Sequence, residues 1–98
     1  MFVKVIKSYR DVVAICDSDL LGKIFEEGKF QLEVKESFYR GEELSEEETS
    51  AMIQKMVRED ATFNIVGKKS IALALKHNLI LREGIKEVQG VPFALVLL

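Results

Sequence analysis

The sequence is poor in the residues that build disulfides, metal centres and nucleophilic active sites. Among its 98 residues it has no tryptophan and a single cysteine, histidine and proline, which are Cys16, His77 and Pro92. A lone cysteine cannot form a disulfide within the chain, and one cysteine with one histidine falls short of the three good ligands that a zinc site requires. The sequence therefore predicts no metal or other cofactor, and it fits a reducing compartment.

Long apolar runs are missing as well. The last stretch, VPFALVLL at residues 91–98, is far shorter than the roughly 20 residues needed to cross a bilayer, so it is predicted to be a buried strand. The first residues alternate at once between apolar and charged types, without the basic start and apolar core of a signal peptide. We expect a cytoplasmic protein that does not associate with membranes.

Motifs of common catalytic sites are also absent. The stretch GKKS at residues 67–70 lacks the leading glycine and the spacing of a phosphate-binding loop, and no GxGxxG occurs. Cys16, His77 and Asp17 are a conceivable nucleophile, base and acid, since such a site needs a thiol beside a histidine that an acid orients. A buried thiol and a surface histidine near a helix end explain the same residues more simply. We therefore predict that the protein is not an enzyme.

Charge is unevenly distributed along the chain. The formal net charge is −2, which argues against general affinity for nucleic acid. Residues 36–60 carry eight acidic and three basic residues, a net charge of −5, and the rest of the chain carries eight acidic and eleven basic residues, a net charge of +3. An acidic middle and a mildly basic remainder can present a positive face despite the acidic total.

Hydrophobic periodicity predicts one α+β domain over residues 1–98, in which about three helices cover a mostly antiparallel sheet. We expect strands at residues 2–6, 12–16, 30–34, 63–66, 85–88 and 91–98, the first two forming a hairpin. A first helix is predicted between a cap at Asp17 or Ser18 and Gly28, and a second over residues 46–58 behind the capping box SEEE. A third follows Gly67 and runs to about Leu79.

The connection at residues 37–44 contains two aromatic side chains, Phe38 and Tyr39, which are unusual in a polar loop. One interpretation is that they fold back onto the core. The other is that they form an exposed pair for stacking or for contact with a partner.

The most suggestive unit is residues 62–79, where a strand end meets Gly67 and a basic helix start. Lys68 and Lys69 fall in the first turn of the helix, where free backbone N–H groups and the helix dipole favour an anion. Five cations gather within nineteen residues, namely Lys68, Lys69, Lys76, Arg82 and Lys86. The unit is therefore interpreted as a phosphate-facing site, with Lys23 a weaker candidate, or alternatively as an ordinary solvated helix face.

Three segments in this order and spacing resemble a small archaeal family, domain of unknown function number 424: VAICDSDLLGKIFEEGKFQLEVKESFYRG, NIVGKKSIALALKHNLI and IKEVQGVPFALV. The resemblance covers nearly the whole chain and implies no established activity, only a provisional label of RNA binding. The motif residues carried over by position are Cys16, Asp17, Leu21, Gly22, Lys23, Phe25, Gly28, Phe38, Tyr39, Asn64, Gly67, Val91 and Pro92. Relatives tend to carry histidine and glutamine where this chain has Phe93 and Leu95.

The residues and the resemblance together favour a non-catalytic RNA-binding or translation-associated accessory protein. It would contact structured RNA, ribosomal or transfer, through the phosphates, using Lys68, Lys69, Lys76, Lys86 and Lys23. The alternative is a protein-interaction module or a homodimer without a nucleic-acid role, which would use the loop at residues 38–39 or a strand edge.

Overall fold

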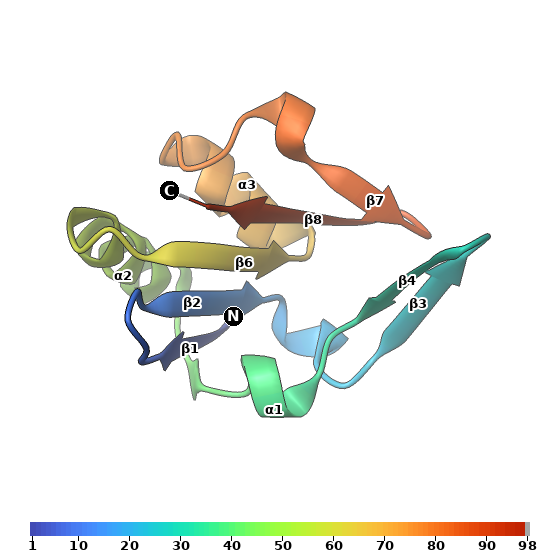
Figure 1. Cartoon of the computed structure of the whole chain (residues 1–98), viewed down its shortest axis with the longest axis horizontal. Coiled ribbons are helices and arrows are strands. Elements are labelled where there is room, and N and C mark those ends of the chain that lie inside the picture. Colours follow the sequence, from blue (N-terminus) through green and yellow to red (C-terminus); the bar gives the residue numbers. More distant parts are fainter. Residues whose placement is uncertain (98) are drawn as a thin grey trace.

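The computed structural model describes residues 1–97, which are organised around a six-stranded sheet (Figure 1). Its strands lie side by side in the order β5-β1-β2-β6-β8-β7. They are β1 (Phe2–Ile6), β2 (Val12–Cys16), β5 (Glu42–Glu43), β6 (Thr62–Val66), β7 (Lys86–Val88) and β8 (Val91–Val96). Only β2 and β6 are parallel to each other, and all other neighbours in this sheet are antiparallel. The predicted α+β class and mostly antiparallel sheet are confirmed.

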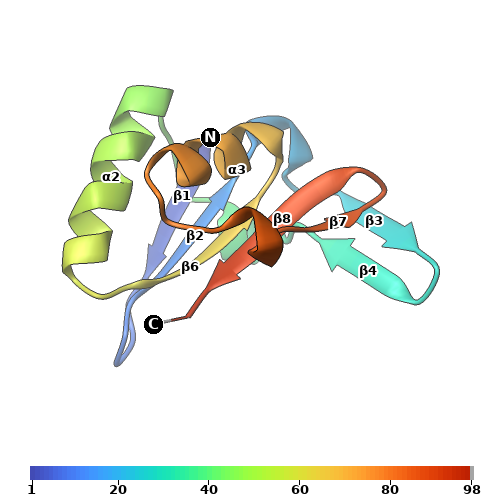
Figure 2. The same ribbon diagram turned by 90° about the horizontal axis from the view of Figure 1, so that it is seen from above.

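Two helices, α2 (Glu46–Arg58) and α3 (Lys68–Lys76), cover one face of this sheet (Figure 2). The predicted capping box sets the start of α2: the Glu48 backbone N–H donates to Ser45 Oγ at 3.1 Å, and the Ser45 backbone N–H donates to Glu48 Oε1 at 2.9 Å. These bonds to Ser45 hold the pKa of the Glu48 carboxyl below its usual range. The main core lies between these helices and the sheet, and includes Val13, Ile15, Ile53, Met56, Phe63, Ile65, Ile71 and Leu73.

The opposite face of the sheet is covered only in part. Helix α1 (Glu36–Tyr39) and a hairpin of β3 (Ile24–Glu27) and β4 (Phe30–Glu33) pack there on a second, smaller core. Its buried residues are Ala14, Cys16, Val34, Tyr39 and Val66. The hairpin forms its own two-stranded sheet and extends away from the body (Figure 1).

The predicted helix between residues 17 and 28 is wrong. That segment contains a short 3-10 turn, η1 (Ser18–Leu20), and then β3. The backbone of Gly22 has φ +84°, a value that glycine tolerates and that interrupts a helix. Phe25 then pairs with Leu32 across the hairpin, so both apolar side chains face the second core. Tertiary packing of a strand thus overrides a spacing that also fits a helix.

The connection at residues 37–44 is more ordered than predicted, since it contains the end of α1 and all of β5. Tyr39 is buried, Phe38 is half-buried, and their rings meet edge to face with centroids 5.0 Å apart. Burial, and to a lesser degree the neighbouring Cys16, raises the pKa of Tyr39 to about 12. The interpretation that these aromatics fold back onto the core is confirmed, and the exposed-pair alternative is wrong.

Candidate functional site

The carboxyl ends of β2 and β6 form the most distinctive local arrangement in the protein. Because these strands are parallel, both end at the same edge of the sheet, and Asp17 follows one while Gly67 follows the other. The Asp17 backbone N–H donates to the carbonyl of Val66 at 3.1 Å, which continues the ladder by one residue. In open α/β sheets, this is the edge at which ligands bind.

Asp17 caps helix α3 from fifty-two residues away in the sequence. Its carboxylate accepts the backbone N–H of Lys69 on Oδ2 at 3.0 Å and that of Ser70 on Oδ1 at 2.8 Å. The Ser70 hydroxyl donates to the same Oδ1 at 2.7 Å. Three hydrogen bonds and the positive end of the helix dipole therefore compensate the burial of this carboxylate, which is 7% exposed.

Gly67 and Pro92 complete the arrangement. A Cβ at position 67 would lie 2.3 Å from the Asp17 carboxyl carbon, so only glycine leaves room for the carboxylate. The Gly67 N–H donates to the carbonyl of Pro92 at 2.8 Å, while the Gly67 carbonyl accepts from Ile71 inside α3. In a regular antiparallel pair, the Gly67 carbonyl would accept from the N–H of residue 92. Because it accepts from Ile71 instead, no N–H is needed at position 92, and a proline fits inside β8.

This geometry corrects the sequence interpretation of the helix start. The sequence predicts that free N–H groups in the first turn of this helix face an external anion, but Asp17 already accepts those of Lys69 and Ser70. The signal that could have revealed this is the aspartate placed directly after a buried strand, which needs a donor when it is buried. Ser70, whose hydroxyl joins the cap, was not identified from the sequence at all.

The side chains of Lys68 and Lys69 remain exposed around a small cleft at this edge of the sheet. The cleft has a volume of about 300 Å³ and is lined by Asp17, Asp19, Leu20, Lys68, Lys69, Gly90, Val91 and Pro92. Two carboxylates and two ammonium groups therefore share it. Its surface is of mixed charge, not purely basic.

A second groove joins two of the predicted lysines along the outer side of α3. Lys69, Ala72 and Lys76 line it, together with Met1, Leu44, Ser45, Glu46 and Leu73, and its volume is about 520 Å³. Lys68, Lys69 and Lys76 form no ion pair with a carboxylate anywhere in residues 1–97. Glu46 at the start of α2 is the acidic residue in this groove.

The other predicted residues lie outside these two sites. Lys86 is exposed on β7 and Lys23 is exposed just before β3, so neither lines the cleft or the groove. Asn64 is half-buried in the middle of β6, in register with Ala14 of β2 and Leu95 of β8. At Gly22, an added Cβ would be 3.6 Å from the side chain of Glu36. The structure therefore unites Asp17, Gly67 and Pro92 but leaves Gly22 and Asn64 apart.

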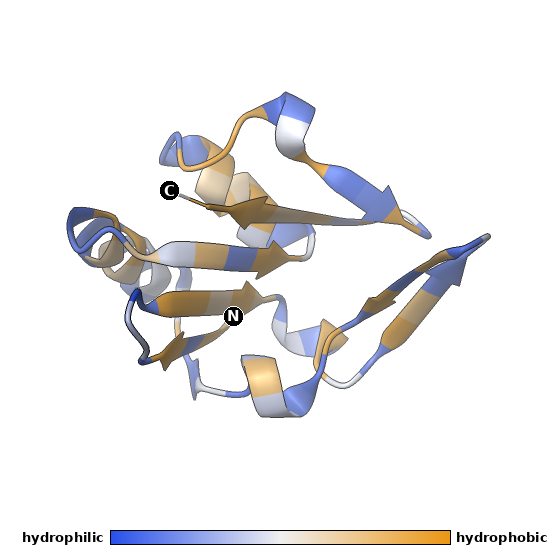
Figure 3. Ribbon diagram, in the orientation of Figure 1, coloured by the Kyte–Doolittle hydropathy of each residue, from blue (hydrophilic) through white to orange (hydrophobic). Residues whose placement is uncertain are grey.

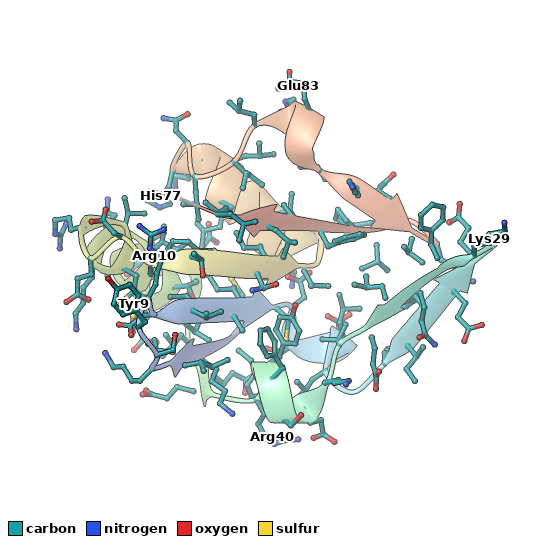
Figure 4. All side chains as sticks on the ribbon, viewed as in Figure 1. Tyr9, Arg10, Lys29, Arg40, His77 and Glu83 are labelled. Atoms are coloured by element: carbon teal, nitrogen blue, oxygen red, sulfur yellow. The ribbon has the colours of Figure 1, made fainter. Side chains whose placement is uncertain are left out.

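The conceivable catalytic trio is not assembled. Cys16 is fully buried in the second core, whereas His77 follows α3 on the other side of the sheet, where its Nε2 lies 2.9 Å from Ser50 Oγ of α2 (Figure 4). The sheet therefore separates the thiol from the imidazole. Within residues 1–97, no three histidine, cysteine, aspartate or glutamate side chains are close enough together to hold a metal ion.

Burial makes Cys16 a poor nucleophile. Loss of hydration, and then the negative charge of Asp17, raises the pKa of its thiol from 9.0 to about 11. At neutral pH this leaves about 100-fold less thiolate than in the unfolded chain. We therefore expect Ellman's reagent to react with the native protein at least ~100-fold more slowly than with the same protein in denaturant. Native and denatured rates within tenfold of each other would contradict the burial of this thiol.

The family model for proteins of unknown function, DUF424, matches residues 6–98. The chain belongs to this family. The suspected resemblance is thereby confirmed, and the family has no assigned activity. No curated protein matches the chain.

A crystal structure of an uncharacterized conserved protein from Methanopyrus kandleri has a similar fold. The TM-score is 0.85 at 24% sequence identity, and the match covers 97% of this chain and 88% of the other. At this identity the similarity supports the fold alone. None of the helices in the described part of the chain is long and apolar enough to cross a membrane.

Proposed function

We propose that the protein is a cytoplasmic, non-catalytic accessory protein of translation that binds structured RNA, ribosomal or transfer, through the outer side of α3. The observation that carries this proposal is the row of exposed lysines on that helix. Lys68, Lys69 and Lys76 are all exposed, and none forms an ion pair with a carboxylate in residues 1–97. Ammonium groups without a protein counter-ion are available to phosphates.

The spacing of these lysines suits a phosphate backbone lying along the helix. Lys69 and Lys76 are seven residues apart, two helical turns, so they lie on the same side of α3 with a rise of about 10 Å between them. Ala72 sits between them and leaves the groove open. Glu46 in the groove, and Asp17 and Asp19 in the neighbouring cleft, lower the local positive charge. Binding is therefore expected to be weak and strongly dependent on salt.

The test is fluorescence anisotropy with labelled transfer RNA and a labelled ribosomal RNA fragment over a range of salt concentrations. With three or four phosphates neutralised, the logarithm of the affinity should fall with the logarithm of salt concentration with a slope of about −2 to −3. The double substitution Lys68→Glu with Lys69→Glu should abolish binding, because it replaces two cations with two anions at the end of the row.

The matched control is Lys29→Glu with Lys35→Glu. It makes the same change in net charge but places it on exposed residues away from α3. Lys29 is at the far tip of the β3–β4 hairpin, and Lys35 lies between β4 and α1 (Figure 4). The control should retain most of the affinity. Absent binding, binding that salt does not weaken, or equal loss in both double variants would each count against α3 as the RNA-contacting surface.

A further inference from the structure

The C-terminal half of β8 has an unpaired, apolar edge. The Gly67 N–H donates to the Pro92 carbonyl, and the register of β6 with β8 continues from that pair through Ile65 opposite Ala94. Hydrogen-bonding groups alternate in direction along an antiparallel strand, so Ala94 bonds toward β6 and Leu95 points its N–H and C=O the other way. On that side β7 begins only at Lys86, which pairs with Phe93, so it does not reach Leu95. Among residues 1–97, no strand therefore pairs with the outward side of the Leu95 backbone.

This edge lies beside a groove and not against a covering element. The groove has a volume of about 460 Å³ and runs between β8 and the connection that precedes β7. It is lined by residues 79–81, Glu83, Gly84 and residues 94–97. Leu95 and Leu97 are 59% and 77% exposed. No backbone hydrogen bond from the connection reaches Leu95 in the described chain.

The two outer strands of the same sheet are protected in the way that proteins usually protect edges, by shortness and charge. β5 has two residues, Glu42 and Glu43, and β7 has three, of which Lys86 and Glu87 are charged. Residues 94–97, by contrast, read Ala-Leu-Val-Leu, with no charge and no proline. Figure 3 shows this contrast between the hydrophilic β7 and the hydrophobic end of β8. An exposed apolar edge of this kind is a template on which another strand can pair.

We propose that the protein forms a symmetric homodimer in which residues 95–97 pair antiparallel with the same residues of a second copy. A two-fold axis at Val96 sets Leu95 of one copy opposite Leu97 of the other, and the reverse. Leu95 has outward-facing backbone groups, and continuing the alternation one residue past the end of β8 gives Leu97 the same direction, so each pair exchanges two hydrogen bonds. An uncharged segment opposes its own copy without repulsion, whereas the glutamates of β5 would repel theirs.

The dimer also covers exposed side chains. Leu95 and Leu97 project from the face of the sheet that α2 and α3 do not cover, because the half-buried Val96 between them packs against the main core on the other face. Opposite residues in an antiparallel pair stand close enough to contact. The two copies therefore place four leucines side by side, and their six-stranded sheets become one continuous sheet.

Sedimentation velocity over a range of protein concentrations tests the proposal. The wild-type protein should sediment as a dimer that dissociates on dilution. The variant Leu95→Pro should be monomeric, because proline lacks the N–H that pairs with the second copy. Its circular dichroism spectrum should be unchanged, because the Leu95 N–H faces away from β6 and makes no hydrogen bond in the sheet of the subunit. Hydrogen exchange gives an independent reading: the Leu95 amide should be protected in the dimer and exchange rapidly in the monomer.

A charge exchange tests the register itself, and does so even if Leu95→Pro fails to fold. The variant with Leu95→Lys and Leu97→Lys sets lysine against lysine, so it should be monomeric, as should the variant with glutamate at both positions. Mixing the two should restore a dimer. The control Ile24→Lys, on the exposed side of the hairpin, should leave the dimer intact.

Three outcomes would overturn the assignment. These are a wild-type protein that is monomeric at every concentration, a dimer that survives both the lysine and the glutamate variants, and a mixture of these variants that stays monomeric. A monomer that instead binds an apolar peptide along this edge would assign the groove to a different protein, and would equally exclude the second copy.

Discussion

Replacing Gly67 with alanine should lower the free energy of unfolding by about 3–5 kcal/mol, among the largest effects expected for one methyl group. The backbone there has φ 111° and ψ 154°, a region occupied essentially by glycine alone. The new Cβ would also lie 2.3 Å from the Asp17 carboxyl carbon. Either the carboxylate moves and loses its hydrogen bonds, or the start of α3 moves away from β2. Chemical denaturation of the purified variant measures the loss.

Two other glycines separate the cost of the backbone conformation from the cost of the contact with Asp17. Gly28 has φ +60° but an added Cβ there meets nothing within 4 Å, so Gly28→Ala should cost only the backbone term, about 1 kcal/mol. Gly84 has neither a positive φ nor a neighbour, so Gly84→Ala should change stability by less than about 0.5 kcal/mol. If Gly67→Ala lowers the free energy of unfolding no more than Gly28→Ala does, the contact between the new Cβ and Asp17 does not contribute to the loss.

Removing the Asp17 carboxylate should destabilise the protein by about 3 kcal/mol, as expected for the loss of charge-assisted hydrogen bonds to a buried helix start. Asp17→Ala leaves the Lys69 and Ser70 backbone N–H groups and the Ser70 hydroxyl without their acceptor. Asp17→Asn keeps one acceptor oxygen but turns an NH₂ group toward a donor, so it should also be destabilising. Thermal and urea unfolding of the variants provide the measurement.

The neighbouring Asp19 is the matched control, since it is an exposed carboxylate in the same cleft. Asp19→Ala should leave stability within about 0.5 kcal/mol of the wild type. A double-mutant cycle adds a sharper test. Once Asp17 is alanine, the Cβ of Gly67→Ala no longer meets a carboxylate, so the double variant should lose clearly less stability than the sum of the losses in the two single variants. Strict additivity would show that the two residues do not act as one unit.

Features encoded by neighbouring residues were predictable from the sequence. The capping box at Ser45 and Glu48 correctly predicts the start of α2, because both of its hydrogen bonds join residues that are three apart in the sequence. The alternation of residues 2–6 and the β-branched run of residues 12–16 likewise predicted the first hairpin and its antiparallel pairing. These signals need no knowledge of what the segment packs against.

Features that depend on distant contacts were not predictable. Leu20, Leu21, Ile24 and Phe25 have a helical spacing, but the choice of a strand depends on Leu32 and on the core that Phe25 enters. Asp17 was assigned as a cap for the residues that follow it, whereas it caps a helix fifty-two residues later. The lysines were found because charge is visible in a sequence, but the carboxylates that share their cleft and groove became visible only in the fold.

The distant cap makes the two long helices unequal partners in folding. Helix α2 contains its own start signal, so it can begin to form while the rest of the chain is still unfolded. Helix α3 has nine residues and no side-chain cap of its own, and helices of that length are marginal in water without support. Its first turn is complete only once β2 lies beside β6 and delivers Asp17, which couples helix formation to closure of a long loop.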